Sequence, residues 1–403
     1  MDYRLNTMDY CDTNTTNHFI QVTYLLFSLL LIVTLGQLFF LLRFFARLAR
    51  HPLLALPQKE LSLFQLSLPQ VSVVICAHNE LPRLKKFLPG ILAQQHPEFE
   101  VIIVNDRSTD ASAAWLEAQM SIHSSLCVVT IDQTPEGWNA KKHALVQGVK
   151  TARYDVILLT DADCAVNSPH WIQHMCQPLL DPHIEIVLGF SPYFKHKGVL
   201  NWFIQYETFF TAIQYLSFAL LGKAYMGVGR NLAYRRKLFA NGEILERFKG
   251  ITGGDDDLFI NQVANAHNTS VCMHPEAHIL SVPKTTWTDW YRQKLRHLSV
   301  GKLYQAKYQY LLGFLLFTQT LFWFLSILGT IFELYNSNEP IFEGIIFLFS
   351  LRMLVLLSIY NVIIRKLRID VNVWWIPTLD FLYIFYIFII GSLAISRKRI
   401  KWT

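Results

Sequence analysis

Four long apolar runs constrain this 403-residue chain more than any other feature of its sequence. The runs are Phe19 to Leu42, Leu311 to Phe332, Ile341 to Ile364 and Val373 to Ile395. Each is close to the ~20 residues that a helix needs to cross a bilayer. Hydrophobic residues make up 52% of the chain, which is high for a water-soluble protein. We therefore expect an integral membrane protein with about four transmembrane helices.

Basic residues beside these runs predict the orientation of the chain. Arg43, Arg47 and Arg50 follow the first run and place its C-terminal end in the cytoplasm by the positive-inside rule. Two later signals conflict, because residues 365–368 and residues 397–401 are both rich in Lys and Arg. A chain that starts outside and crosses four times ends outside. Either the tail departs from the rule, or one run lies in the interface or re-enters.

Charge and cysteine usage exclude some partners. The net charge is +6, but Lys and Arg cluster beside the apolar runs and form no long basic tract, so we expect no nucleic acid partner. The six cysteines contain no C-x-x-C pair and are expected to be reduced, buried thiols. We expect membrane lipids to surround the four runs.

Between the first and second apolar runs, short β-branched runs alternate with segments compatible with helices. The expected strands are Val71 to Cys76, Phe99 to Val104, Leu126 to Ile131, Asp155 to Thr160 and Ile184 to Leu188. This alternation predicts an α/β domain with a Rossmann-like, mainly parallel sheet and helices on both faces. Ligands of such sheets bind beyond the carboxyl ends of the strands.

The expected organisation follows from these patterns. It comprises an N-terminal tail (1–18), a transmembrane helix (19–42), a linker (43–70), the α/β domain (71–285), an interfacial segment (286–309), three C-terminal transmembrane helices (310–396) and a basic tail (397–403). Within the α/β domain, Trp202 to Leu221 is aromatic and apolar but carries Gln205, Glu207 and Gln214, so it is expected to lie in the membrane interface.

Carboxylates follow two of the expected strands. Asp106 ends the second strand region, and Asp161-Ala162-Asp163 follows the fourth. Two carboxylates at i and i+2 can reach one hard cation such as Mg²⁺ or Mn²⁺, which can bridge them to a diphosphate. Turns are rich in Asp, so the pair alone is weak evidence, but its place after a buried strand strengthens it. Ser108-Thr109-Asp110 is equally well explained as a helix N-cap.

Three adjacent carboxylates occur in Gly253-Gly254-Asp255-Asp256-Asp257. A solvated helix start or a cation site would explain them. The functional alternative is a general base whose proton affinity is raised by neighbouring charges and which deprotonates an attacking hydroxyl.

In this order the motifs resemble glycosyltransferase family 2, the inverting sugar transferases that include cellulose, chitin and hyaluronan synthases and ceramide glucosyltransferases. The resemblance covers Val71 to about Tyr304 and extends to the flanking membrane runs. It implies a GT-A fold for residues 71–285, a cytoplasmic catalytic domain in a bacterial cell membrane, and a nucleotide-sugar donor, most simply a UDP-sugar.

The resemblance also implies roles for residues that match the family's motifs. The expected donor-binding residues are Glu80, Asp106, Lys141, Asp161, Gln293 and Arg296. Asp161 and Asp163 match the metal-binding pair, Asp256 matches the catalytic base with Asp255 as the alternative, and Asn231 and His297 fall on the acceptor side. The family's Q-x-x-R-W motif departs here to end in His297, which puts the identity of the acceptor in doubt.

The expected reaction transfers a sugar to a lipid or glycan acceptor at the membrane. A processive polysaccharide synthase that secretes through its own spans is one alternative. A non-catalytic membrane scaffold that only binds a nucleotide-sugar is another. A two-metal phosphotransferase or nuclease fits poorly, because the chain has no P-loop and no basic groove.

Two charged residues fall within expected spans, Arg352 and Asp380. Charge inside a bilayer is costly and usually faces a bundle interior or a cavity. The pair is expected either to hold helices together or to take part in translocation.

Overall fold

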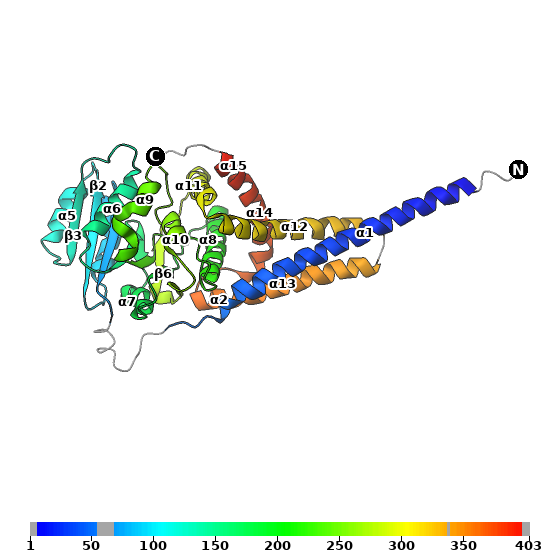
Figure 1. Cartoon of the computed structure of the whole chain (residues 1–403), viewed down its shortest axis with the longest axis horizontal. Helices are drawn as coiled ribbons and strands as arrows, with labels where there is room; N and C mark the ends of the chain where they lie inside the picture. Colours follow the sequence, from blue (N-terminus) through cyan, green and yellow to red (C-terminus); the bar gives the residue numbers. More distant parts are fainter. Residues whose placement is uncertain (1–5, 55–67, 337–338, 397–403) are drawn as a thin grey trace.

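The computed structural model of the protein describes residues 6–54, 68–336 and 339–396. An α/β domain lies at one end of an elongated helical bundle, and the chain enters that bundle from its far end (Figure 1). Residues 55–67 of the expected linker and the whole expected basic tail, 397–403, lie outside the described residues.

Seven strands form the main sheet in the order β3-β2-β1-β4-β7-β6-β8. Its first four strands are parallel: β3 (Leu126–Ile131), β2 (Phe99–Asp106), β1 (Val71–Ala77) and β4 (Val156–Asp161). The strands β1, β2 and β4 are almost continuously buried, as expected for runs rich in Val and Ile that are covered on both faces. The predicted mainly parallel α/β fold is confirmed.

Two strands of this sheet were not predicted. The strand β7 (Leu232–Arg235) is inserted antiparallel between β4 and β6 (Ile186–Gly189), and β8 (Thr269–Cys272) pairs in parallel with β6. Each has only four residues, which is too short for a clear period of two. The sheet is therefore mixed beyond β4. A separate two-stranded sheet pairs β5 (Cys164–Val166) with β9 (Ile279–Ser281).

Helices cover both faces of the main sheet. One face packs against α4 (Leu81–Leu92), α5 (Ser112–Met120) and α7 (Trp171–Cys176). The opposite face packs against α6 (Ala140–Thr151) and α8 (Val199–Ala219), and this core continues without interruption into the membrane helices. The core of the α/β domain and the end of the bundle nearest to it thus form one continuous hydrophobic core.

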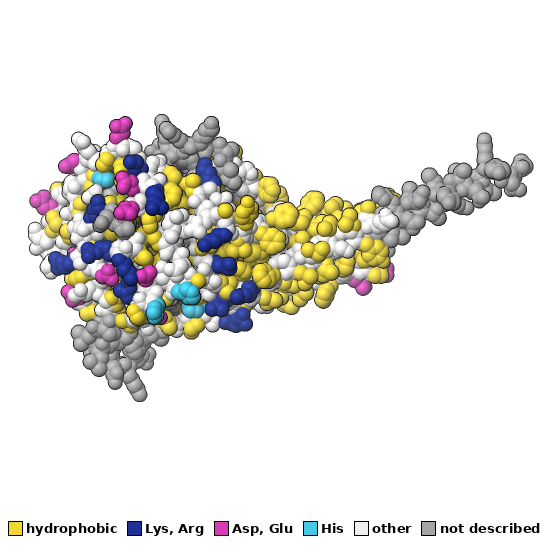
Figure 2. Space-filling view, in the orientation of Figure 1, with side chains coloured by type: hydrophobic (Ala, Val, Ile, Leu, Met, Phe, Trp, Pro, Cys, Tyr) yellow, Lys and Arg dark blue, Asp and Glu magenta, His cyan; other side chains and the backbone are white. Residues whose placement is uncertain are grey.

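Three long helices form the bundle (Figure 1). The first is α1 (Asn6–Phe40), which continues through η1 (Leu41–Phe45) and α2 (Ala46–Arg50); the others are α12 (Ala306–Asn336) and α13 (Glu339–Leu367). The first helix therefore begins inside the expected tail and runs into the expected linker. Hydrophobic side chains cover the visible face of the bundle, as a lipid-facing surface requires (Figure 2).

The fourth apolar run takes a different direction. Residues Val373–Ala394 have the length and composition of a span, as do Gln21–Arg50, Ala306–Tyr335 and Glu339–Leu367. However, the run is made of α14 (Ile376–Tyr386), η7 (Ile387–Gly391) and α15 (Ser392–Ser396), and it lies at a steep angle to the long helices, against α12 at the end nearest the sheet (Figure 1). The start of this run contacts α8, where Trp375 meets Trp202, and its middle contacts the segment that follows the domain, where Tyr386 meets Trp290. Whether this run crosses the membrane, lies in the interface or re-enters stays a prediction.

The helix α8 joins the domain to the bundle. Its Phe218 ring packs on Phe44 with centroids 4.7 Å apart, and its Phe210 ring packs on Tyr383 at 4.7 Å. Most of its residues are buried, and its Glu207 pairs with Lys294 of α11 (Trp287–Val300) in the interior. The expectation of a helix lying on the membrane surface is corrected here: protein, not lipid, covers the apolar side chains of α8.

A polar network ties the helices of the bundle together. Arg352 Nη1 donates to Asp380 Oδ2 at 2.8 Å, and Arg352 Nη2 donates to Gln37 Oε1 at 3.1 Å. Asp380 also accepts from Gln319 Nε2 and Trp323 Nε1, each at 2.8 Å. At least one residue from each of α1, α12, α13 and α14 takes part, so the predicted pairing of Arg352 with Asp380 is present, while the buried Arg352 Nε has no hydrogen-bond partner among the described residues.

Candidate active site

Three neighbouring strands bring the expected site residues to one edge of the sheet. Because β1 lies between β2 and β4 and all three are parallel, their carboxyl ends coincide. Cys76 is in register with Asp161, and Ala77 is in register with Asn105. The residues that follow these strands therefore face the same region, as the rule for open α/β sheets requires.

Two loops at this edge are tied together by side chains. Asn79 follows β1 with a φ of 54°, and its Oδ1 accepts hydrogen bonds from the backbone N–H groups of Thr109 at 2.8 Å and Asp110 at 3.2 Å. Asp110 in turn accepts from the N–H of Ser112 at 3.0 Å and of Leu81 at 3.2 Å. Asp110 thus caps helix starts, which is the structural alternative expected for this segment.

Glu80 and Asp106 are each held by a neighbouring arginine. Both Glu80 oxygens accept from Arg83 Nη1, at 2.6 and 2.7 Å, and the buried Asp106 accepts from Arg107 Nε at 2.8 Å and Nη2 at 3.1 Å. These pairs fix the carboxylates at the edge of the sheet. Their roles in binding the donor remain predictions.

Lys141 connects the end of β4 to the segment Gly253-Gly254-Asp255-Asp256-Asp257, which we call the acidic loop. Its Nζ lies 2.9 Å from Asp161 Oδ1 and 3.6 Å from Asp255 Oδ2. Burial acts to lower the pKa of Lys141, but the charges of Asp161 and Asp255 outweigh it, and the pKa lies well above the usual value. A permanent positive charge therefore stands between two expected site carboxylates that are 94 positions apart in sequence order.

Asp161 and Asp163 fit the expected divalent cation. Burial, and then the charge of Asp161, raises the pKa of Asp163 above the usual value. Two carboxylates in a turn that repel each other present hard oxygen donors, and an ion such as Mg²⁺ or Mn²⁺ would relieve the repulsion. The residues present are those that such an ion prefers.

Lys142 holds the acidic loop in place from inside the fold, a role that was not predicted. Its fully buried Nζ donates to the carbonyl oxygen of Ile251 at 2.6 Å and to that of Gly253. Gly253 and Gly254 have φ values of 83° and 73°, in the left-handed region that favours glycine. Burial lowers the pKa of Lys142. The adjacent lysines therefore have separate tasks, since Lys141 faces the carboxylates and Lys142 holds their loop.

Asp255 and Asp256 have opposite electrostatic environments. Burial opposes ionisation of Asp255, but Lys141 prevails and the pKa of Asp255 is lowered. Burial and the charge of Asp255 raise the pKa of Asp256. Asp256 Oδ2 accepts from the N–H of Gly229 at 2.6 Å, and its Oδ1 accepts from the N–H of Asp257 at 2.8 Å. A raised pKa makes Asp256 the stronger base of the two.

Asp257 is a structural residue at the start of α10 (Asp257–Val263). Its Oδ2 accepts from the hydroxyl of Tyr304 at 3.0 Å, which joins α10 to the chain just before α12. Burial and then Asp256 raise the pKa of Asp257 well above the usual value.

The expected acceptor residue Asn231 lies inside the fold, and its role on the acceptor side stays a prediction. Asn231 is fully buried, accepts from Trp171 Nε1 at 3.0 Å and donates to two backbone carbonyl groups at 2.8 Å. Its amide is therefore fully used inside the fold. The preceding Arg230 lies closer to the site: its guanidinium is 4.5 Å from the Tyr193 ring centroid. Burial acts to lower the pKa of Arg230, but Tyr193 and then Cys164, Asp161 and Asp163 raise it above the usual value.

Helix α11 supplies the last expected residues. The side chain of Gln293 donates to the Tyr193 hydroxyl at 3.5 Å, and Arg296 lies beside Gly253 of the acidic loop. His297 is next to Arg296, with 3.5 Å between Nε2 and the Arg296 Nη2. Its ring keeps exposed surface, yet desolvation and the charge of Arg296 lower its pKa well below the usual value.

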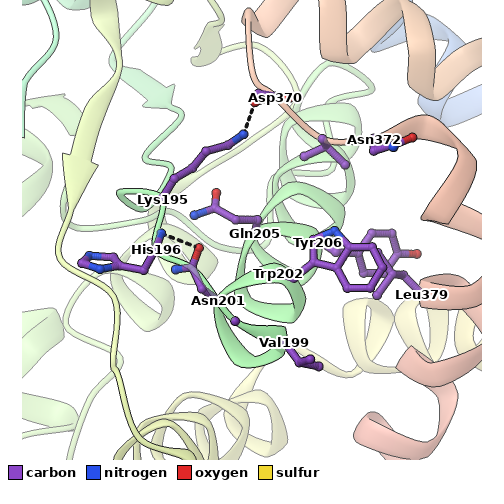
Figure 3. Close-up of a pocket in the computed structure, with 12 residues that line it drawn as sticks. Lys195, His196, Val199, Asn201, Trp202, Gln205, Tyr206, Asp370, Asn372 and Leu379 are labelled. Carbon is purple, nitrogen blue, oxygen red and sulfur yellow. Dashed lines mark hydrogen bonds and ion pairs between the residues drawn. The ribbon is translucent and has the colours of Figure 1, made fainter.

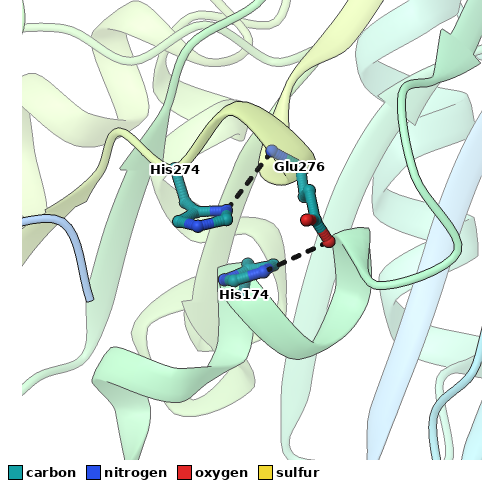
Figure 4. A group of neighbouring side chains, drawn as sticks. All are labelled: His174, His274 and Glu276. Carbon is teal, nitrogen blue, oxygen red and sulfur yellow. Dashed lines mark hydrogen bonds and ion pairs between the residues drawn. The ribbon is translucent and has the colours of Figure 1, made fainter. Parts of the chain in front are cut away.

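A second group of possible metal ligands lies elsewhere (Figure 4). His174 Nε2 is 3.7 Å from Glu276 Oε2, and the rings of His174 and His274 are stacked with centroids 3.8 Å apart and planes 13° apart. A metal ion lies in the plane of each imidazole that binds it, and two stacked, nearly parallel rings share no such position. Burial is the main cause that lowers the pKa of His174 to about 4, so the rings stack as neutral groups.

The fold and this edge of the sheet define a glycosyltransferase with a GT-A catalytic domain. Residues 69–299, more than half of the chain, match the family model described as Glycosyltransferase like family 2. The chain belongs to this family, and the resemblance drawn from its motifs is confirmed.

Similar proteins match smaller parts of the chain. The 4,4'-diaponeurosporenoate glycosyltransferase of Staphylococcus haemolyticus (strain JCSC1435) is 29% identical over 123 residues, which is 30% of this chain and 32% of that protein. The protein of the same name in Staphylococcus aureus (strain USA300) is 36% identical over 93 residues, which is 23% of this chain and 24% of that protein. The chain thus spans only a third or less of the length of these relatives.

Two solved structures are similar over longer stretches but at low identity. The mannosyltransferase PcManGT from Pyrobaculum calidifontis, in complex with GDP-Man and Mn²⁺, is 18% identical, with 93% of each chain covered and a TM-score of 0.47. S. aureus TarS 1-349, in complex with UDP-GlcNAc, is 16% identical, with 80% of this chain and 92% of that chain covered and a TM-score of 0.41. At this distance neither structure assigns a ligand to this chain.

Sequence reasoning missed three residues that the structure brings to the site: Lys142, Tyr193 and Arg230. The first and third lie beside residues that the motifs did select, Lys141 and Asn231. A motif gives the position of a turn or helix start, but only the backbone direction decides which of two adjacent side chains faces inward. Tyr193 lies in no motif, and no signal in the sequence marks it.

Proposed function

We propose that this glycosyltransferase moves a sugar from a UDP-sugar to a lipid acceptor at the surface of a bacterial membrane, with inversion at the anomeric carbon. The observation that carries the proposal is the position of Lys141, whose Nζ lies 2.9 Å from Asp161 and 3.6 Å from Asp255. It joins the expected metal pair to the loop that carries the expected base. A scaffold that only binds a nucleotide would not need a carboxylate with the raised pKa of Asp256 in addition to the metal pair Asp161 and Asp163.

The residues present can perform a single in-line displacement. Asp256, with its raised pKa, takes the proton of the acceptor hydroxyl as the oxygen bonds to the anomeric carbon. The bond from that carbon to the diphosphate breaks, and the nucleoside diphosphate leaves with the electron pair. Lys141 and Arg296 hold positive charge where the leaving group's charge develops. A divalent cation bound by Asp161 and Asp163 would neutralise the same diphosphate.

The lipid acceptor is supported by how the domain joins the bundle. The core of the domain is continuous with the membrane helices through α8, so the site lies close to the bilayer surface. The exposed Arg43, Arg47 and Arg50, together with Arg365 and Arg368, lie at the end of the bundle nearest the domain. By the positive-inside rule this end, and with it the domain, is in the cytoplasm, where nucleotide-sugars are made.

The test is release of UDP by purified protein in nanodiscs with bacterial lipid extract, Mn²⁺ and a panel of UDP-sugars. We expect release with at least one donor, dependence on added lipid, and loss with EDTA. Nucleotide binding without turnover on any donor would favour the scaffold. A ladder of products in place of a single addition would favour the processive synthase.

A further inference from the structure

A pocket of about 490 Å³ lies where the domain meets the bundle, apart from the carboxylates of the site (Figure 3). One wall comes from the segment before α8 and its first two turns, including Lys195, Trp202 and Tyr206. The other wall comes from the connection between α13 and α14, including Asp370, and from the first turn of α14, which contributes Leu379. Its volume is within the ~300–1,000 Å³ of typical small-molecule sites.

The lining separates into a polar rim and an apolar interior. Lys195 and Asp370 form an ion pair across the rim, and both remain largely exposed. Tyr206 and Leu379 are buried, and the Trp202 ring meets Trp375 edge to face with centroids 4.7 Å apart. A ligand that satisfies both parts has a polar end and an apolar body.

The pocket lies beside the end of one candidate membrane helix and the start of another. The helix α13 ends at Leu367, just before the rim residue Asp370, and α14 begins at Ile376, just after it. Val199 at the rim is 70% exposed and Trp374 nearby is 83% exposed. Exposed Trp beside a helix end is typical of the membrane interface, where one side of the ring is apolar and the other is wet. Lipid can therefore enter the pocket directly.

A short series of contacts links the pocket to the site. Gln205 lines the pocket and donates to the carbonyl oxygens of Tyr193 at 3.1 Å and Phe194 at 3.2 Å. The ring of the same Tyr193 lies against Arg230, whose neighbour Gly229 donates to the proposed base Asp256. Tyr193 and Arg230 thus link Gln205 in the wall of the pocket to Gly229, which contacts Asp256.

We propose that this pocket binds the apolar chain of the acceptor next to its polar end, so that the acceptor hydroxyl is presented past Tyr193 to the site. This inference rests on the proposed function, because it names where that function's lipid substrate binds. The occupant is a single-chain amphipathic lipid, since one pocket of this volume holds part of one chain. The ion pair of Lys195 and Asp370 lies where the polar end would pass.

The experiment uses a long-chain alcohol carrying a diazirine as the probe, with the full-length protein in nanodiscs. After illumination, mass spectrometry should place label on peptides containing residues 195–206 and 370–379. Val199→Trp, at the exposed rim, should obstruct the pocket and lower this labelling by about tenfold, equivalent to roughly 1.4 kcal/mol of binding free energy. Ile122→Trp is the matched control, because Ile122 is 68% exposed and does not line the pocket.

Label confined to the lipid-facing sides of α1, α12 and α13, or equal labelling in V199W, would overturn the proposal. UDP release with lipid extract, measured on the same samples, should fall in V199W while UDP binding is unchanged. If the proposed function is wrong, no variant releases UDP, yet the labelling still reports whether the pocket takes a lipid. The two failures are therefore distinguishable.

Discussion

Replacing Lys142 with Met tests whether the acidic loop is held in place from inside the fold. The wild-type ammonium donates to the carbonyl oxygens of Ile251 and Gly253, and the side chain has no exposed surface. Each hydrogen bond from a charged donor contributes about 1.5–3 kcal/mol, so losing two removes about 3 kcal/mol or more. Met keeps the length of the apolar stem but cannot donate to either carbonyl group.

We expect K142M to lower kcat/KM by about a hundredfold, since about 3 kcal/mol corresponds to roughly two decades. The loss should fall mainly on kcat, because Asp256 moves with the loop while Lys141 and Asp161 still bind the donor. Hydrogen exchange of the amides in 250–256 should become faster. Lys150→Met is the matched control, because Lys150 is exposed on the last turn of the same helix.

The reasoning is refuted if K142M keeps activity within about threefold of wild type, a difference of only ~0.65 kcal/mol. It is also refuted if K142M loses UDP binding to the same extent as Lys141→Met. In that case the two lysines would share one role in binding the donor, and the separation of their tasks would be wrong.

Three further predictions follow from the site and the bundle. Asp256→Asn should abolish transfer but preserve UDP binding by calorimetry, and retained transfer would exclude Asp256 as the base. A general base acts only when it is deprotonated, and the pKa of Asp256 is raised. On acidification, kcat/KM should therefore begin to fall at a higher pH than the pKa of an ordinary Asp would give. A profile of kcat/KM that stays flat down to the usual Asp range contradicts this. Arg352→Met or Asp380→Asn alone should destabilise the protein in detergent by about 3–5 kcal/mol, whereas the double variant should recover part of the loss; additive losses would show that the pair does not couple.

The parallel half of the sheet was predictable because its strands are buried on both faces. Val71 to Ile75 and Val101 to Val104 are continuous apolar runs, apart from Ser72, and each is followed by the polar residues of the site. The antiparallel β7 was not predictable, because Leu232–Arg235 has four residues and its pairing depends on β4 and β6, which are distant in sequence. Local sequence patterns predict which strands are buried, but they do not predict the order in which strands pair in the sheet.

The candidate site was predictable to within one residue at two of its positions. The motifs located the start of α6 and the turn before β7, but successive side chains on a helix point about 100° apart and those on a strand point to opposite faces. Lys141 and Lys142 therefore diverge, as do Arg230 and Asn231. The Lys142 contact with Gly253 also joins residues 111 positions apart, which no local pattern contains.

The course of the last apolar run bears on which acceptor the enzyme can serve. Composition makes Val373–Ala394 a span, and four spans could in principle surround a channel for a growing polymer. In the structure α14 lies at a steep angle to the long helices, against α12, and Asp380 contacts Arg352, Gln319 and Trp323 there. Both Asp380 oxygens and both terminal nitrogens of Arg352 have protein partners, so this charged pair by itself does not require a water-filled path. A bundle closed in this way favours a substrate that arrives from the side, through the bilayer, over one that leaves through the middle.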